Sequence, residues 1–166
     1  MHPIPSIIEN PPFKLLMVED NMADIKLMLE AIRITGLKSI AEADYALNAE
    51  GGYALLHRAH LAHRPYDMII IDLNMPRIDG KEMLASLKND SRYDGIPIFI
   101  MSNSDTMRDM SDCYNLGADA YIQKPTELQR LLDFFEAVKY SLVHEGRASA
   151  DDIDRRYEQL KKQDKR

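Results

Sequence analysis

Short apolar runs alternate along this chain with stretches whose apolar residues recur every three or four positions. The runs predict buried strands, and the spaced residues predict amphipathic helices. Strands are predicted over residues 13–18, 67–72, 96–101 and 118–122, with a second strand before residue 50, and helices over residues 22–35, about 53–63, 81–88, 105–116 and 127–142. Because right-handed crossovers place helices on both faces, this order predicts an α/β fold: a five-stranded parallel sheet, doubly wound as (βα)5 and flavodoxin-like.

The second strand has two alternatives, residues 39–43 or residues 45–49. The second is preferred, because Gly51 and Gly52 would form a break after the strand and a helix would start near Tyr53.

Capping residues predict two helix starts and one helix end. Asn21 is suited to cap the first helix, and Gly36 is suited to end it. Thr126 with Gln129 three residues later forms a capping-box pattern before the last helix.

Composition divides the chain into an N-terminal arm (1–12, with four prolines), a main domain (13–145) and a charged C-terminal tail (146–166). The tail carries a thin apolar stripe on a possible helix beginning after Ser149, made by Ile153, Tyr157 and Leu160. The preferred interpretation of the tail is a solvated, frayed segment. The alternative is a helix that docks on a partner or on a second copy of the chain.

Charge and cysteine content exclude several classes of protein. The 166 residues carry a formal net charge of −6, which argues against general nucleic-acid binding. Cys113 is the single cysteine, so an internal disulfide is excluded. No apolar run approaches the roughly 18 residues that cross a bilayer. These features predict a soluble cytoplasmic protein with no membrane partner.

Charged and hydroxyl side chains stand at the ends of four predicted strands. Glu19 and Asp20 come after the first strand, Asp72 closes the third, Ser102 comes after the fourth and Lys124 comes two residues after the fifth. Parallel strands bring their carboxyl ends to one edge, where open α/β sheets bind ligands. We therefore expect these side chains to converge.

Their chemistry points to a cation and a phosphoryl group. Neighbouring carboxylates resist joint ionisation, and Mg²⁺ with its preference for hard oxygen ligands would relieve the repulsion. Asp72 could act as a nucleophile toward phosphorus, with Lys124 and Ser102 contacting the transferred group. Glycine-rich phosphate loops of the GxGxxG and GxxxxGK types do not occur in the sequence.

The chain resembles the receiver domain of two-component response regulators over residues 13–145. The matching elements are Val18-Glu19-Asp20-Asn21, Ile71-Asp72-Leu73-Asn74-Met75-Pro76, Asp79-Gly80, Met101-Ser102, Gly117-Ala118-Asp119-Ala120-Tyr121 and Lys124-Pro125. The segments from Asp20 to Asp24, from Asp72 to Pro76 and from Leu87 to Asp90 are most similar to single-domain regulators paired with bacterial phytochromes.

The resemblance implies roles at the site. Asp72 would accept a phosphoryl group from a phosphohistidine on a sensor histidine kinase, with a bacteriophytochrome as the candidate, or on a phosphotransfer protein. Asp20 would ligate Mg²⁺ directly, Glu19 through water, and Asn74 through its backbone carbonyl. Asp72 would complete the metal site.

The resemblance also implies how phosphorylation is sensed. Ser102 and Lys124 would contact the phosphoryl group, and Tyr121 would turn inward as Ser102 moves. The Lys124–Pro125 bond would be cis, as in the family. The output would be a changed surface on the helix-four, strand-five, helix-five face, read by a downstream protein or a homodimer. Independently of the resemblance, Phe134, Tyr140 and Tyr121 suggest an apolar patch on the outer face of the last helix, because Phe134 adjoins the core-facing Phe135.

Three rival functions differ in what they require. A phosphohydrolase of the haloacid dehalogenase type needs a second carboxylate two residues after Asp72, where this chain has Asn74. A flavodoxin-like electron carrier needs a phosphate-binding loop where Glu19 and Asp20 stand. A receiver-like docking module that is never phosphorylated stays open as the alternative. The expectation is a phosphoacceptor rather than an enzyme, with at most slow self-dephosphorylation.

Overall fold

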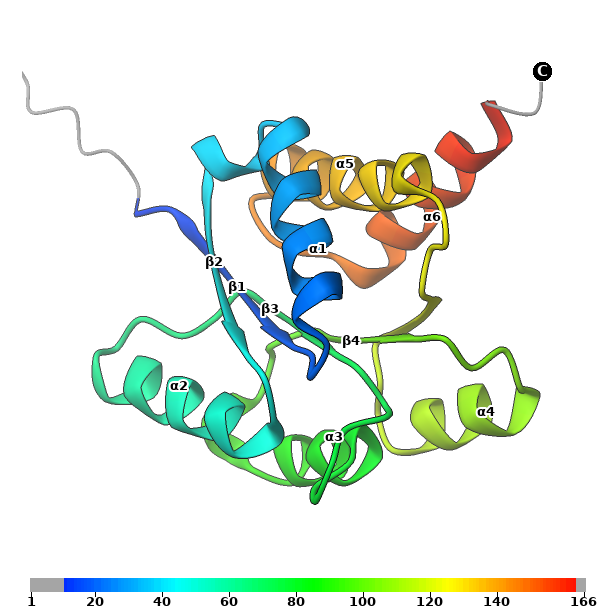
Figure 1. Ribbon diagram of the computed structural model, residues 1–166. Coiled ribbons are helices and arrows are strands. Elements are labelled where there is room, and N and C mark those ends of the chain that lie inside the picture. The colour runs from blue at the N-terminus through cyan, green and yellow to red at the C-terminus, as the bar shows by residue number, and fades with distance from the viewer. Residues whose placement is uncertain (1–10, 164–166) are drawn as a thin grey trace, which may run out of the picture.

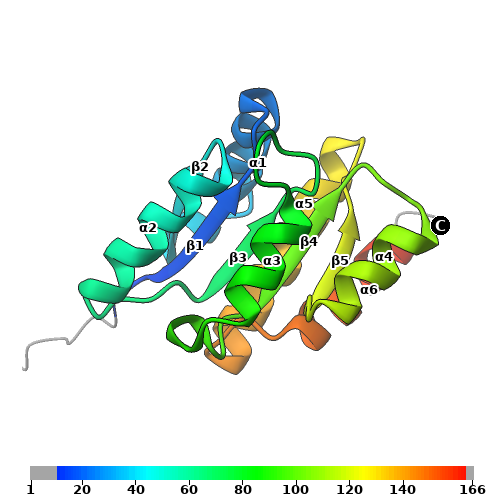
Figure 2. The same ribbon diagram turned by 90° about the horizontal axis from the view of Figure 1, so that it is seen from below.

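The computed structural model describes residues 11–163, so most of the expected N-terminal arm lies outside the described residues. The fold is built on one sheet of five parallel strands in the order β2-β1-β3-β4-β5 (Figure 2). The strands are β1 (Phe13–Val18), β2 (Ala41–Ala46), β3 (Met68–Ile71), β4 (Ile98–Ser102) and β5 (Ala120–Gln123). The five-stranded parallel α/β prediction is confirmed.

Helices cover both faces of the sheet (Figure 1). One layer contains α1 (Met22–Ile34), α5 (Leu128–Glu145) and α6 (Ala150–Gln163), and the other contains α2 (Ala49–Leu61), α3 (Gly80–Lys88) and α4 (Met107–Asn115). Two short 3-10 helices, η1 (Leu37–Ser39) and η2 (Ser91–Tyr93), complete the described elements. Within residues 11–163, no helix combines the length and the apolar character needed to cross a bilayer.

Coverage on both faces explains why β1, β3 and β4, in the middle of the sheet, are mostly apolar along their length. Leu15 and Met17 of β1 pack in the core beneath α1 and α5, whereas Leu16 and Val18 pack in the core beneath α2 and α3. Successive side chains of a strand point to opposite faces, so a strand covered on both faces is apolar at every position.

The preferred position of the second strand is wrong. β2 ends at Ala46, and α2 begins at Ala49 after Asn48, whose side chain accepts from the Gly51 N–H at 2.7 Å. Gly51 and Gly52 therefore lie inside a helix. A Cβ on Gly52 would come within 2.8 Å of Met83 Cε and 3.1 Å of Val18 Cγ2, so this glycine lies where α2 packs closely against its neighbours and not in a turn.

Two of the predicted helix boundaries are confirmed and one is wrong. The Asn21 side chain caps α1, and Gly36, with φ of 76°, follows its end. The capping box at Thr126 and Gln129 is not formed. The N-cap of α5 is Glu127, without a side-chain cap, because Gln129 donates to the Asp133 carboxylate one turn further on.

The C-terminal tail is part of the folded domain. α6 begins after Ser149, as predicted, but the expectation of a solvated tail is wrong because Ile153 and Tyr157 are buried against α5. The helix docks on its own chain, and the Tyr157 ring meets Phe134 edge-on at 5.7 Å between centroids.

The predicted outer patch at Phe134 is therefore wrong, since α6 covers that face of α5 and Phe134 is fully buried. Tyr140 is 42% exposed, lies against His144, and has the Arg156 guanidinium 4.8 Å above its ring. Tyr140 thus borders the seam between α5 and α6.

Candidate functional site

Three carboxylates meet where β1 and β3 end. The two strands are neighbours in the sheet, with Val18 paired to Ile71, so Glu19 and Asp20 emerge beside Asp72. One oxygen from each of these acids lies within 4.8 Å of the others. Glu19 and Asp72 are buried and Asp20 is exposed, which leaves the cluster open on one side.

The side chain of Lys124 faces this cluster. Lys124 follows β5, and its backbone N–H donates to the Ser102 carbonyl at 2.7 Å, which ties it to the end of β4. Its Nζ lies 2.6 Å from Glu19 Oε2 and 3.8 Å from Asp72 Oδ1. Nζ also donates to Asp24 Oδ2 at 3.0 Å.

The expected cis bond between Lys124 and Pro125 is wrong, because the residues that the structure describes contain no cis peptide. The trans form is the intrinsically favoured isomer even before proline. Lys124 reaches Glu19 and Asp24 from this backbone.

The hydroxyl groups at the site are linked through one loop. Ser102 is fully buried, and its Oγ accepts from the Ser104 N–H at 3.2 Å. Tyr121 is nearly buried, and its hydroxyl donates to the Ser104 carbonyl at 2.8 Å. In the loop between β4 and α4, the backbone N–H of Ser104 is therefore bound by Ser102 and its carbonyl by Tyr121.

Burial makes the acidic cluster energetically unfavourable by itself. Desolvation raises the pKa of Glu19 to about 7, although the hydrogen bond from Lys124 opposes the shift. Desolvation likewise raises the pKa of Asp72, Lys124 opposes the rise, and the charge of Asp20 adds to it. The three carboxylates beside the Lys124 ammonium group form an oxygen-only donor set that suits a hard divalent cation. Glu19, Asp20 and Asp72 are the residues that would hold it.

Asn74 lies in the exposed part of the loop after β3. A hydrogen bond to its backbone lowers the pKa of Asp72 and partly offsets the effect of burial. Its carbonyl remains a predicted ligand.

Two residues that shape the site were not assigned a role there from the sequence. Asp24 lies in the first turn of α1, and it hydrogen-bonds Lys124 across 100 positions. Gly80, the first residue of α3, lies so close to the backbone of Asp72 that a Cβ would come within 2.3 Å of the Asp72 carbonyl oxygen. The local motif Asp79-Gly80 was a signal for the second of these contacts.

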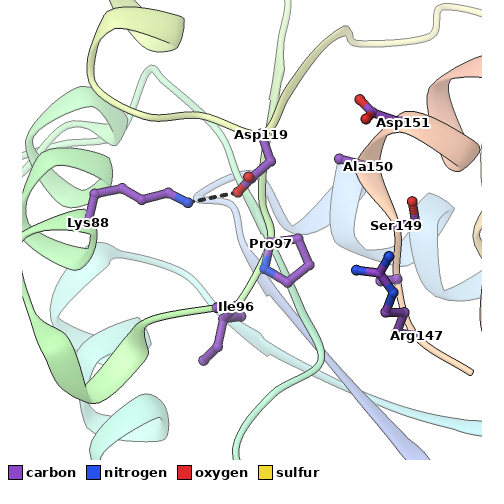
Figure 3. A pocket seen from close by; sticks show the side chains of 10 residues that line it. Lys88, Ile96, Pro97, Asp119, Arg147, Ser149, Ala150 and Asp151 are labelled. Atoms are coloured by element: carbon purple, nitrogen blue, oxygen red, sulfur yellow. Dashed lines mark hydrogen bonds and ion pairs between the residues drawn. The ribbon is translucent and has the colours of Figure 1, made fainter.

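A hollow of about 310 Å³ lies at the opposite edge of the sheet, before β4 and β5 (Figure 3). Lys88 and Asp119 point toward one another there, and Asp119 Oδ2 accepts from Lys88 Nζ and from the Ile98 N–H, both at 2.8 Å. These charges are satisfied within the fold, so the acidic cluster at the carboxyl edge is the stronger candidate site.

Comparison with known proteins agrees with this geometry. Residues 15–136 match the family model described as the response regulator receiver domain. Among characterised relatives, the probable methanogenesis regulatory protein FilR2 of Methanothrix harundinacea is 29% identical over 136 residues, covering 77% of this chain and 82% of FilR2. Response regulator Rcp1 of Synechocystis is 28% identical over 137 residues, covering 78% of this chain and 88% of Rcp1.

Solved structures give the same result. The phosphorylated cyanobacterial phytochrome response regulator RcpA superimposes with a TM-score of 0.71 at 29% identity, covering 81% of this chain and 96% of RcpA. The Mn²⁺-bound form of a response regulator Rcp1 superimposes with a TM-score of 0.67 at 26% identity, covering 80% of this chain and 96% of that structure.

Proposed function

Because the chain belongs to the response regulator receiver family, we propose that Asp72 accepts a phosphoryl group from a phosphohistidine on a sensor histidine kinase or a phosphotransfer protein. The observation that carries this proposal is the geometry around Asp72. Its buried carboxylate has Lys124 Nζ at 3.8 Å, and one oxygen each of Glu19 and Asp20 lies within 4.8 Å of one of its own oxygens.

In the proposed reaction a carboxylate oxygen of Asp72 attacks the phosphorus atom. A P–O bond forms as the P–N bond to the histidine breaks, and the imidazole nitrogen keeps the electron pair of that bond. Lys124 offsets negative charge on the phosphoryl oxygens, and the Ser102 hydroxyl offers them a hydrogen bond.

The donor set supports Mg²⁺ as the cation, held by Glu19, Asp20, Asp72 and the Asn74 carbonyl. When bound, Mg²⁺ would neutralise charge on the phosphoryl oxygens. The comparison with the Mn²⁺-bound Rcp1 structure supports a divalent cation of this kind.

The hydrogen bonds around Ser104 suggest how the signal leaves the site. If Ser102 turns toward a phosphoryl group, its Oγ no longer accepts from the Ser104 N–H, and the support of the β4–α4 loop changes. Tyr121 would follow, because its hydroxyl is bound to the same residue. The readout would then fall on α4 and β5, together with the part of α6 that lies beside them.

The likeness to phytochrome response regulators supports a bacteriophytochrome as the partner kinase in the cytoplasm, and a downstream protein as the reader of the changed surface.

The test is a phosphorylation assay with acetyl phosphate and Mg²⁺, followed by mass spectrometry. The native chain should gain one acid-stable, base-labile phosphoryl group, and Asp72→Asn should gain none. Asp151→Asn, the same change on the exposed first turn of α6, is the matched control and should be phosphorylated like the native chain. A native chain that gains no phosphoryl group would favour the docking-module alternative.

A further inference from the structure

Lys124 is held by three carboxylates at unequal distances. Its Nζ lies 2.6 Å from Glu19 and 3.0 Å from Asp24, both within hydrogen-bond range, but 3.8 Å from Asp72, which is outside it. The ammonium group is therefore bound on the side of Glu19 and Asp24, outside hydrogen-bond range of the Asp72 carboxylate.

Asp24 differs from the other two acids in position and exposure. It stands in the first turn of α1, outside the group of acids whose oxygens lie within 4.8 Å of one another. Its side chain is 27% exposed, whereas those of Glu19 and Asp72 are 3% and 6% exposed. The metal site does not account for Asp24, whose observed side-chain partner is Lys124.

We infer that Asp24 is a positioning residue that holds Lys124 back from Asp72 and is released when a phosphoryl group arrives. A phosphoryl group brings about two negative charges and three acceptor oxygens. Two of the three ammonium donors of Lys124 contact Glu19 and Asp24, and Nζ lies 3.8 Å from Asp72, so a shift of Nζ toward the new acceptor lengthens an older contact. The longer, more solvent-screened contact with Asp24 is the one that gives way.

This assignment rests on the proposed function and adds a consequence to it. The Asp24–Lys124 contact stabilises the unphosphorylated state alone, so it opposes phosphoryl binding by the free energy of that contact. Partly exposed ion pairs are worth up to about 1 kcal/mol, which corresponds to about a fivefold change in affinity.

The experiment measures the affinity of beryllofluoride, a phosphoryl mimic, by ¹⁹F NMR titration at saturating Mg²⁺. Asp24→Asn and Asp24→Ser should each bind beryllofluoride about two- to fivefold more tightly than the native chain. Asp24→Glu keeps a carboxylate and should restore affinity toward the native value. Glu30→Gln removes a charge from the exposed part of the same helix, where Glu30 pairs with Arg33, and should have no effect.

A double-mutant cycle separates positioning from a merely structural effect. In a Lys124→Ala background, Asp24→Asn should leave the beryllofluoride affinity unchanged, because the group that Asp24 restrains is gone. An effect of equal size in both backgrounds would overturn the inference, as would unchanged or weaker binding by both Asp24 variants. A native chain that binds no beryllofluoride would overturn the proposed function as well, so the two failures are distinguishable.

Discussion

Gly80 offers a direct test of how the fold places Asp72. It is the first residue of α3, and its N–H donates to the Leu73 carbonyl at 2.9 Å. A Cβ at this position would lie 2.3 Å from the Asp72 carbonyl oxygen and 2.7 Å from Leu73 Cα. Both neighbours are backbone atoms, so the Gly80→Ala protein can relieve the overlap only by moving α3 or the end of β3.

The expected cost follows from two opposing effects. Overpacking costs about 1–3 kcal/mol, and contacts with backbone atoms belong at the upper end of that range. Alanine in a helix is favoured over glycine by about 1 kcal/mol, which offsets part of the cost. Gly80→Ala should therefore lower the free energy of unfolding by about 2 kcal/mol and shift the urea midpoint down by about 1 M.

The assay is urea unfolding together with phosphorylation by acetyl phosphate. Because the displaced backbone carries the proposed acceptor, Asp72, the Gly80→Ala protein should also be phosphorylated more slowly under conditions where it remains folded. Gly51→Ala, the same change in the first turn of α2, meets only side-chain atoms at 3.2 Å and 3.3 Å and should change stability by less than about 1 kcal/mol. If Gly80→Ala matched the native chain in both stability and rate, the close approach described here would be refuted.

Three further predictions concern α6, the acidic cluster and the cation. In urea unfolding, Tyr157→Ala should lower the free energy of unfolding by about 3 kcal/mol, because the buried ring packs on Phe134. Arg155→Ala, on the exposed side of α6, should change that free energy by less than about 0.5 kcal/mol, and equal effects of the two substitutions would contradict the docking of α6. Because the pKa of Glu19 is raised, the folded state binds a proton more tightly than the unfolded state, and with metal ions removed by a chelator the free energy of unfolding should fall as the pH rises from 4.5 to about 7. The Glu19→Gln substitution should flatten that pH dependence, and an unchanged slope would exclude Glu19 as its source. Mg²⁺ at about 100 times its dissociation constant should raise the free energy of unfolding of the native chain by about 2.7 kcal/mol at pH 7.5. The Asp20→Asn protein should need more Mg²⁺ for the same rise in melting temperature, and a Mg²⁺ titration identical to that of the native chain would show that Asp20 is not a ligand.

The sequence by itself determined the layers of the fold and the members of the acidic cluster. Continuous apolar runs require strands covered on both faces, and Asn21 and Gly36 mark the ends of α1 through local hydrogen bonding and backbone geometry. Glu19, Asp20 and Asp72 each follow a strand directly, so parallel pairing of β1 with β3 is sufficient to bring them together.

Only the tertiary structure decided how distant segments contact one another. Gly52 reads locally as a chain break, but it lies inside α2, where its backbone packs closely against Val18 and Met83. The stripe on α6 is compatible with a free tail or a partner helix, and burial against Phe134 decides between them. The Asp24–Lys124 contact joins residues 100 positions apart. Periodicity and capping are set within a few residues, whereas these contacts depend on where whole elements pack, and that is why the sequence pattern did not reveal them.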